Sequence, residues 1–417
     1  HPRIKGIKTG DKIISSNEFH KEIPKIISNL DNSYLYIQGP PGTGKTYQAA
    51  NAIIELLKQN KKIAITGLSH KVIHNLLQRI EDMASEKQFE FEGYKRGTLE
   101  DDDTVFNGEY IKTYEKDPVF MNALKERDKG QIFAGTKYHL ASTFYDEKID
   151  YLFIDETGQL SLADLISIGN IAKNIILIGD QNQLGQPIKG THPNESGQSI
   201  LDYLLEGKDT IPEDRGIFLN KTYRLNSKLN EFISSNFYEE RLICDERTDK
   251  RIIKFNKKLK IKDSGIHYIE MNHKNNVQTS IEEFEVIKDL MKEMIGLEFD
   301  DNGKKRKLTV DDFLIISPYN TQVNLLISKL EESKIKNPRV GTIDKFQGQE
   351  APVTIISMTS SDSDSLPRNK EFFFSRNRLN VAISRAQVAS IILFNPNLLD
   401  SSPKNLDQIK LMNNFFK

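Results

Sequence analysis

The chain has 417 residues, of which 37% are hydrophobic and 28% charged, and its formal net charge is −1. This length predicts two or three domains, and the composition is that of an ordinary globular protein. Because the charges nearly cancel, a generally basic surface is excluded, and a nucleic acid would have to bind in a local groove. Cys244 is the single cysteine, which excludes internal disulfides, iron–sulfur clusters and zinc sites built from several cysteines.

The hydropathy of the chain predicts a cytoplasmic protein that does not enter a membrane. Apolar runs stay well below the roughly 20 residues that span a bilayer, and the first residues carry no signal-peptide pattern. The eight histidines lack metal-ligand spacing, so we expect no structural metal. Since the chain begins with His1 and Pro2 and lacks an initial Met, we expect it to be a fragment with further domains upstream.

A phosphate-binding P-loop is predicted at Gly39–Thr46. It follows the apolar run Tyr34–Ile37 and precedes a helical pattern, which is the order that a P-loop requires. Glycines let backbone N–H groups approach phosphate oxygens, and the start of the helix adds a partial positive charge. We expect Lys45 to bind the β- and γ-phosphates and Thr46 to hold Mg²⁺. The residues expected to bind the nucleotide are Gly39, Pro40, Pro41, Gly42, Thr43, Gly44, Lys45 and Thr46.

Short β-branched runs alternate with helical segments along the chain, which predicts parallel sheets covered on both faces and an α/β fold class. The runs are Tyr34–Ile37, Lys62–Thr66, Tyr151–Ile154 and Ile175–Ile178, and then Gly216–Leu219, Phe313–Ile316, Val353–Ser357 and Ser390–Phe394. We therefore predict two tandem domains, 1–205 and 206–417, with the ATP site in the first. The periodicity is lost between about 80 and 131, which predicts an inserted subdomain in the first domain.

Two carboxylates, Asp155 and Glu156, follow the third of these runs. The carboxyl ends of parallel strands meet at one edge of a sheet, so these side chains should lie near the P-loop. We expect Asp155 to hold Mg²⁺ and Glu156 to orient and deprotonate the attacking water. Gln183, after the next strand, is expected to sense the γ-phosphate, because an amide can bond both a phosphate oxygen and water. The alternative for this stretch is a plain turn.

Arginines in the second domain are candidates for phosphate contacts. Arg224 offers a planar, permanently charged group, and the neighbouring Tyr223 offers a ring face to a base. Arg385 and Arg378 are seven residues apart near the C-terminus, so they would share one face of a helix. A solvated basic helix is the alternative interpretation of that segment.

Seven motifs in this order resemble those of the superfamily 1 helicases, and within them the 5′→3′ branch that includes the nonsense-mediated-decay RNA helicase and the eukaryotic replication nuclease–helicase. The motifs are Gly39–Thr46, Asp155–Gln159, Gly179–Leu184, Thr222–Arg224, Ser317–Gln322, Gly341–Glu350 and Asn380–Ala386. A finer resemblance, suggested by Gly190–Pro193, is to the helicase half of bacterial RecB-type nuclease–helicase fusions.

The resemblance implies two RecA-like domains that hydrolyse ATP with Mg²⁺ between them. Arg224 and Arg385 would be arginine fingers, so that Glu156, Lys45, Gln183, Arg224 and Arg385 form the catalytic set. Tyr223 would stack on the adenine and Glu350 would lie near the ribose and phosphates. Contacts with a single strand are implied at Ser69, His70, Gly135, Thr136, Pro318, Tyr319 and Thr342. In the family a glutamine before the P-loop usually recognises adenine. The corresponding segment of this chain, Asn17–Glu22, contains no glutamine.

The implied activity is movement along single-stranded DNA in the 5′→3′ direction. DNA is favoured over RNA from the likeness to the nuclease–helicase fusions. A nuclease or accessory domain upstream is the expected partner, and a bacterial protein of this kind would be associated with the nucleoid. Two alternatives stay open, an RNA helicase and a P-loop ATPase switch that binds nucleic acid without translocating. A small-molecule kinase is disfavoured, because the second domain is too large and too similar to the first.

Overall fold

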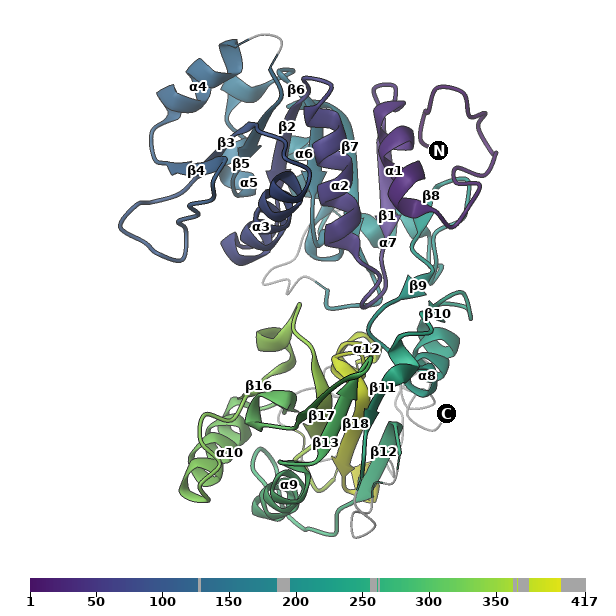
Figure 1. Ribbon diagram of the computed structural model, residues 1–417, viewed down its shortest axis with the longest axis vertical. Coiled ribbons are helices and arrows are strands. Elements are labelled where there is room, and N and C mark those ends of the chain that lie inside the picture. Colours follow the sequence, from purple (N-terminus) through teal and green to yellow (C-terminus); the bar gives the residue numbers. More distant parts are fainter. Residues whose placement is uncertain are drawn as a thin grey trace. The chain divides into compact units, whose positions relative to one another are not determined.

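The computed structural model describes residues 1–126, 129–185, 196–255, 261, 263–362, 366 and 375–398 (Figure 1). The chain divides into two compact units. The first contains residues 1–40, 44–181 and 185–219, and the second contains 41–43, 182–184 and the chain from 220 onwards. Each unit has its own parallel sheet and its own hydrophobic core, which confirms the predicted α/β class. No helix in the described ranges has the length and the apolar character that crossing a membrane requires.

The first unit is built on one sheet of eight parallel strands, in the order β4-β3-β5-β2-β6-β7-β1-β8. The strands are β1 (Tyr34–Gln38), β2 (Lys62–Thr66), β3 (Glu92–Arg96), β4 (Ile111–Tyr114), β5 (Gln131–Ala134), β6 (Ile149–Ile154), β7 (Ala172–Gly179) and β8 (Gly216–Phe218). Four consecutive residues of β1 and four of β2 are buried. A strand buried on both sides must be covered on both faces, which explains its nearly continuous apolar sequence.

Helices cover this sheet. They are α1 (Phe19–Ser28), α2 (Lys45–Leu57), α3 (His70–Glu86), α4 (Asp117–Lys125), α5 (Lys137–Leu140), α6 (Leu162–Gly169) and α7 (Ile200–Leu205). Figure 1 shows α1, α2 and α3 side by side, with α2 in the middle. Residues 49–54 of α2 are buried without a break, as are Leu56 and Leu57, so this helix is buried around most of its circumference.

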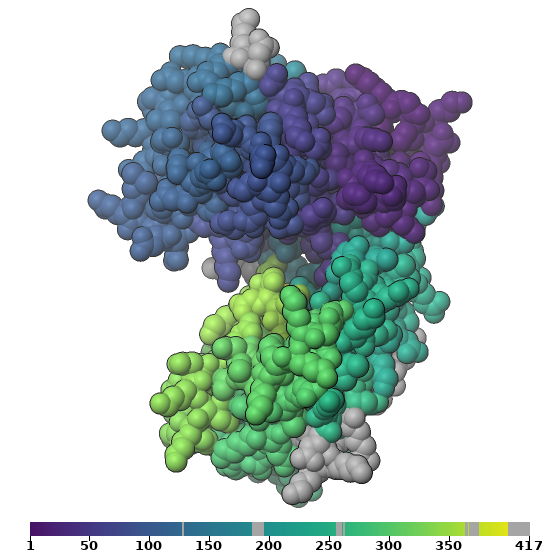
Figure 2. Space-filling view, viewed as in Figure 1, coloured from purple at the N-terminus to yellow at the C-terminus, as the bar shows by residue number. Residues whose placement is uncertain are grey.

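The segment predicted as an inserted subdomain extends the first sheet. Helix α3 continues to Glu86, and β3 and β4 then join the edge of the sheet next to β5. The segment forms one flank of the first unit, in blue in Figure 2. The buried carboxylate of Glu81 accepts hydrogen bonds from the backbone N–H groups of Glu109, Tyr110 and Ile111, at 2.9, 3.0 and 2.7 Å. One side chain of α3 therefore anchors the loop before β4.

The run Gly216–Leu219 corrects the sequence-based division of the chain. It was assigned to the second domain, with the boundary at 205/206, but β8 pairs with β1 in the first sheet, with Ile217 opposite Ile37. The first unit consequently ends at Leu219. An apolar run predicts a strand, but it does not say which sheet the strand joins.

The second unit is built on five parallel strands in the order β12-β18-β17-β15-β16. They are β12 (Gly265–Glu270), β15 (Phe313–Ile316), β16 (Val340–Gly341), β17 (Ala351–Ser357) and β18 (Ala386–Phe394). Two small sheets accompany them, one of β9 (Lys221–Thr222) and β10 (Ile243–Cys244), and one of β11 (Arg251–Ile253), β13 (Glu298–Asp301) and β14 (Lys304–Lys307). The helices are α8 (Ser227–Phe237), α9 (Ile281–Met294), α10 (Asn320–Glu332) and α12 (Arg376–Ile383).

Candidate nucleotide and nucleic-acid sites

The P-loop connects β1 to α2, as its sequence predicted. Gly42 and Gly44 adopt φ angles of +74° and +79°, a left-handed conformation that favours glycine. The N–H of Gly39 donates to the carbonyl of Gly179 at 3.0 Å, which ties the start of the loop to the end of β7. Because α2 begins at Lys45, the free N–H groups of its first turn follow the loop directly. A helix start of this kind binds phosphate.

Asp155 and Glu156 directly follow the carboxyl end of β6. The carboxylate of Asp155 is 7% exposed, and its Oδ1 accepts a hydrogen bond from the N–H of Glu156 at 2.9 Å. Burial and the neighbouring Glu156 raise the pKa of Asp155 to about 7, although the charge of Lys45 acts in the opposite direction. Glu156 has a positive φ of 57°, a strained conformation for a residue with a side chain, and such strain is concentrated at functional sites.

The P-loop and Asp155 lie at the same edge of the first sheet, because β1 and β6 both pair with β7. The charged form of a buried carboxylate is stabilised by a nearby cation, so the environment of Asp155 is suited to a bound cation. In the described part of the chain no group of three or more His, Cys, Asp or Glu side chains forms a metal site.

Gln183 and Arg385 meet in the second unit. Arg385 is 2% exposed, and its guanidinium donates to the carbonyls of Val381 and Gln349, each at 3.2 Å. Its Nη2 also lies 3.5 Å from Oε1 of Gln183. The structure thus brings together two predicted site residues that are about 200 positions apart in the chain.

Arg224 and Glu350 form an ion pair through Nε and Oε2, and Nη1 of Arg224 donates to the carbonyl of Ser384 at 3.2 Å. Burial disfavours the charged form of Glu350, but the Arg224 guanidinium outweighs it and holds the pKa of Glu350 below its usual value. Tyr223 is 45% exposed, and the Arg247 guanidinium lies 5.4 Å from the centre of its ring.

The segment Pro41–Thr43 belongs with the second unit by its contacts. The N–H of Tyr223 donates to the carbonyl of Gly42 at 2.8 Å. A Cβ at Gly42 would lie 2.4 Å from the Cβ of Arg224. Glycine is therefore required at this position both by its φ angle and by the close approach of Arg224.

The four nucleic-acid candidates of the first unit gather at one sheet edge. Ser69 caps the N-terminus of α3 after β2, and its Oγ accepts from the N–H of Val72 at 3.3 Å. Gly135 and Thr136 follow β5, which pairs with β2, and the N–H of Gly135 donates to the carbonyl of Ile65 at 3.1 Å. His70 is half-buried at the first position of α3.

The candidates of the second unit also follow neighbouring strands. Pro318 and Tyr319 come after β15, and Thr342 comes after β16, which pairs with β15. Tyr319 is buried, so its ring does not offer a stacking surface and any contact would be through its backbone. Gly190–Pro193, on which the finer resemblance to nuclease–helicase fusions rests, lies outside the described residues.

No motif in the sequence marks Lys95. Its side chain is completely buried, and its Nζ lies 2.9 Å from Nδ1 of His70. Lys95 belongs to β3, in the segment where periodicity is lost, so no pattern distinguished it from a surface lysine.

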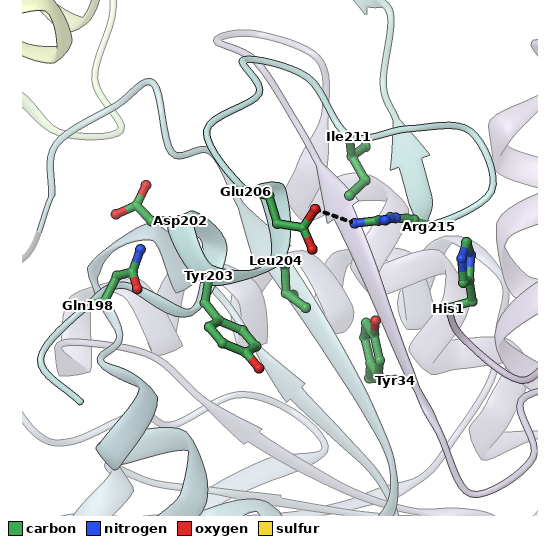
Figure 3. A pocket seen from close by; sticks show the side chains of 9 residues that line it. All are labelled: His1, Tyr34, Gln198, Asp202, Tyr203, Leu204, Glu206, Ile211 and Arg215. Carbon is green, nitrogen blue, oxygen red and sulfur yellow. Dashed lines mark ion pairs between the residues drawn. The ribbon is translucent and has the colours of Figure 1, made fainter. Parts of the chain in front are cut away.

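A pocket of about 480 Å³ lies elsewhere in the first unit (Figure 3). It is lined by His1, Tyr34, Gln198, Asp202, Tyr203, Leu204, Glu206, Ile211 and Arg215. An ion pair of 3.2 Å joins Arg215 and Glu206. Tyr34 is the first residue of β1, whereas the P-loop follows the last residue of this strand. The pocket is therefore separate from the predicted phosphate site. None of its residues was predicted to be functional.

Two families, each described as an AAA domain, match residues 24–188 and 197–397. The chain is 28% identical over 411 residues to the DNA replication ATP-dependent helicase/nuclease dna2 of Schizosaccharomyces pombe, covering 88% of this chain and 27% of that protein. It is 25% identical to the DNA polymerase alpha-associated DNA helicase A of the same yeast, covering 84% of this chain and 59% of that protein. The chain thus spans less than two thirds of either relative.

Among solved structures, the arterivirus nonstructural protein 10 helicase resembles the chain with a TM-score of 0.44 and 14% identity. The match covers 88% of this chain and 60% of that one.

Proposed function

We propose that this chain, a member of the superfamily 1 helicases in the branch that includes the nonsense-mediated-decay helicase and the replication nuclease–helicase, is an ATP-driven motor that moves along single-stranded DNA. The observation that carries the ATP-hydrolysis part of the proposal is the buried carboxylate of Asp155 at the sheet edge of the P-loop. Its pKa is raised to about 7 by burial and by Glu156, while Lys45 is close enough to oppose the shift. Such an arrangement is suited to a bound metal–nucleotide.

In the proposed hydrolysis, Lys45 exchanges the carbonyl of Gly39 for the β- and γ-phosphates. Thr46 and Asp155 would hold Mg²⁺, which would neutralise charge on the phosphates. Glu156 orients a water molecule and takes its proton, and the water oxygen forms a bond to the γ-phosphorus. The bond from the γ-phosphorus to the bridging oxygen breaks, and ADP and phosphate are released.

The second unit contributes positive charge in this proposal. Arg224 and Arg385 act as arginine fingers that stabilise charge on the transferred phosphoryl group. Gln183, within reach of Arg385, couples the γ-phosphate to the strand-binding residues. Tyr223 stacks on the base, and Glu350 orients Arg224 through their ion pair.

The strand is proposed to contact backbone and side-chain donors at the carboxyl edges of the two sheets. Contacts of this kind go mainly to phosphates and carry little sequence information. DNA is favoured over RNA because the names of both relatives described above refer to DNA. The 5′→3′ direction, duplex unwinding and a nuclease partner are proposed from the family.

The test is steady-state ATP hydrolysis without polymer, with single-stranded DNA and with single-stranded RNA, using Glu156→Gln as the blank. Strong stimulation by DNA supports the proposal. Stimulation by RNA alone would indicate the RNA helicase. Rates that neither polymer changes would favour an ATPase switch.

A further inference from the structure

Lys95 places a charged ammonium group inside the first unit. The side chain is 0% exposed, and its Nζ has three partners: Nδ1 of His70 at 2.9 Å, the carbonyl of Thr104 at 3.0 Å, and the carbonyl of Arg96. Burial lowers the pKa of Lys95 to about 8, so the group is still charged near neutral pH. An ammonium group has three hydrogens and no acceptor, and the three partners account for all of them.

This contact determines which nitrogen of His70 carries the proton. Because Lys95 can only donate, Nδ1 of His70 must accept, and a neutral imidazole that accepts at Nδ1 carries its hydrogen on Nε2. Burial, and after it the charge of Lys95, lower the pKa of His70, although Asp101 and Asp103 act in the opposite direction. The neutral form of His70 is therefore favoured.

A second histidine, His74, adds no charge to this cluster at neutral pH. His74 lies one turn further along α3, and burial, followed by the charges of Lys95 and His70, lowers its pKa to about 4. Its ring packs against Phe106, with 5.5 Å between the ring centres. The cluster thus contains one charged group, Lys95, and two neutral imidazoles at neutral pH.

The Nε2 atom, on the other side of the His70 ring, can donate a hydrogen bond to a ligand. Within the described residues Nε2 of His70 makes no hydrogen bond, and the side chain is only half-buried. His70 is the first residue of α3, which is 17 residues long, so the positive end of the helix lies at the same place. Exposed Ser69 precedes it. A donor beside a helix N-terminus at a sheet edge matches an anionic oxygen.

We propose that Lys95 is a positioning residue for nucleic-acid binding, which holds His70 as the Nε2–H tautomer so that this hydrogen is donated to a phosphate of the bound strand. The inference rests on the proposed function, because it requires a strand at this edge of the first sheet. Lys95 comes from β3, so the segment predicted as an insert contributes to binding without touching the strand.

The tautomer is tested directly by nitrogen NMR of ¹⁵N-histidine-labelled protein in the absence of nucleic acid. We expect His70 to carry its proton on Nε2 in the wild type and to be a mixture of the two neutral tautomers in Lys95→Met. A proton on Nδ1 in the wild type would overturn it, whatever the protein does with ATP.

The binding role is tested with a fluorescent oligothymidylate at fixed salt. Glutamine places an amide donor where Nε2 of histidine lies, whereas asparagine replaces only Nδ1. His70→Asn should therefore weaken binding by about 3- to 10-fold, the value of one hydrogen bond, and His70→Gln should stay within about twofold. Equal losses in the two variants would contradict the Nε2–H assignment, and this comparison does not depend on the folding of Lys95 variants.

A double-mutant cycle tests the link between the two residues. Lys95→Met should weaken binding by less than His70→Asn does, because part of its His70 population keeps the Nε2–H tautomer, and it should have little further effect in the His70→Gln background. Independent, multiplicative losses would overturn the positioning role. Lys112→Met, at an exposed lysine of the neighbouring β4, is the matched control and should bind as the wild type does. If the wild type binds neither single-stranded DNA nor RNA, the proposed function fails, which is a result distinct from these.

Discussion

The ammonium group of Lys45 donates a hydrogen bond to the backbone carbonyl of Gly39, with 2.5 Å between the two atoms. The lysine is therefore held within its own loop, and the proposed phosphate contact requires it to exchange this carbonyl for phosphate oxygens. A phosphate oxygen carries negative charge and a carbonyl oxygen does not, so the ammonium group gains Coulomb attraction in this exchange, which favours a bound nucleotide.

Replacing Lys45 by alanine should weaken nucleotide binding by about 10- to 100-fold, which corresponds to about 1.5–3 kcal/mol for a charge-assisted hydrogen bond. Isothermal titration calorimetry with an ATP analogue that cannot be hydrolysed measures this loss. Lys58→Ala, at the exposed C-terminal cap of α2, is the control and should bind normally. Unchanged affinity in Lys45→Ala would remove this lysine from the phosphate site.

Glu156→Gln should bind ATP as the wild type does and fail to hydrolyse it. Glutamine keeps the size of the side chain and can orient water, but it cannot take a proton. A single-turnover assay should therefore show cleavage reduced by roughly 10²-fold or more. Wild-type turnover in this variant would mean that another group is the base.

Asp155 should make the stability of the nucleotide-free protein depend on pH. In the folded chain its pKa is about 7, against 3.8 for an unperturbed aspartate. Between pH 3.8 and about pH 7 the folded state binds more protons than the unfolded state. The free energy of unfolding should therefore fall as pH rises through this range. The loss is about 1.4 kcal/mol per pH unit at most.

Asp155→Asn should remove this dependence and should be at least as stable as the wild type above pH 7. Urea unfolding of both proteins across this pH range provides the measurement. Parallel pH profiles for the two proteins would show that Asp155 does not keep its proton.

Arg385→Ala should lower ATP turnover by roughly 10³-fold, as the loss of an arginine finger does, with a much smaller effect on nucleotide binding. Because the guanidinium is buried and bonded to Val381 and Gln349, the variant also needs a stability measurement. Arg385→Lys keeps the charge but not the planar fork, and it should be slow as well. Full turnover in folded Arg385→Lys and Arg385→Ala would exclude the finger role.

Several features were predictable because they are local in the chain. The strand, glycine-rich turn and helix of the P-loop are consecutive, and so are β6 and the pair Asp155 and Glu156. Parallel strands bring their carboxyl ends to one edge, so it followed that the two motifs meet in the first unit. The assignment of Mg²⁺, the catalytic base and the arginine fingers to particular residues stays a prediction.

Other features depended on partners that are distant in sequence. The run Gly216–Leu219 looked like the first strand of a new domain, yet its backbone pairs with β1. The ion pair between Glu350 and Arg224 likewise joins residues that are far apart in the chain. Neither relationship has a period or a motif that a single sequence displays.

The sequence by itself determined the α/β class, the P-loop and the order of the motifs, because hydrophobic period and glycine placement act over a few residues. Only the tertiary structure decided that β3 and β4 extend the first sheet, that Lys95 is buried, and that its ammonium group faces Nδ1 of His70. Burial and hydrogen bonding between distant residues arise only once the sheet has assembled.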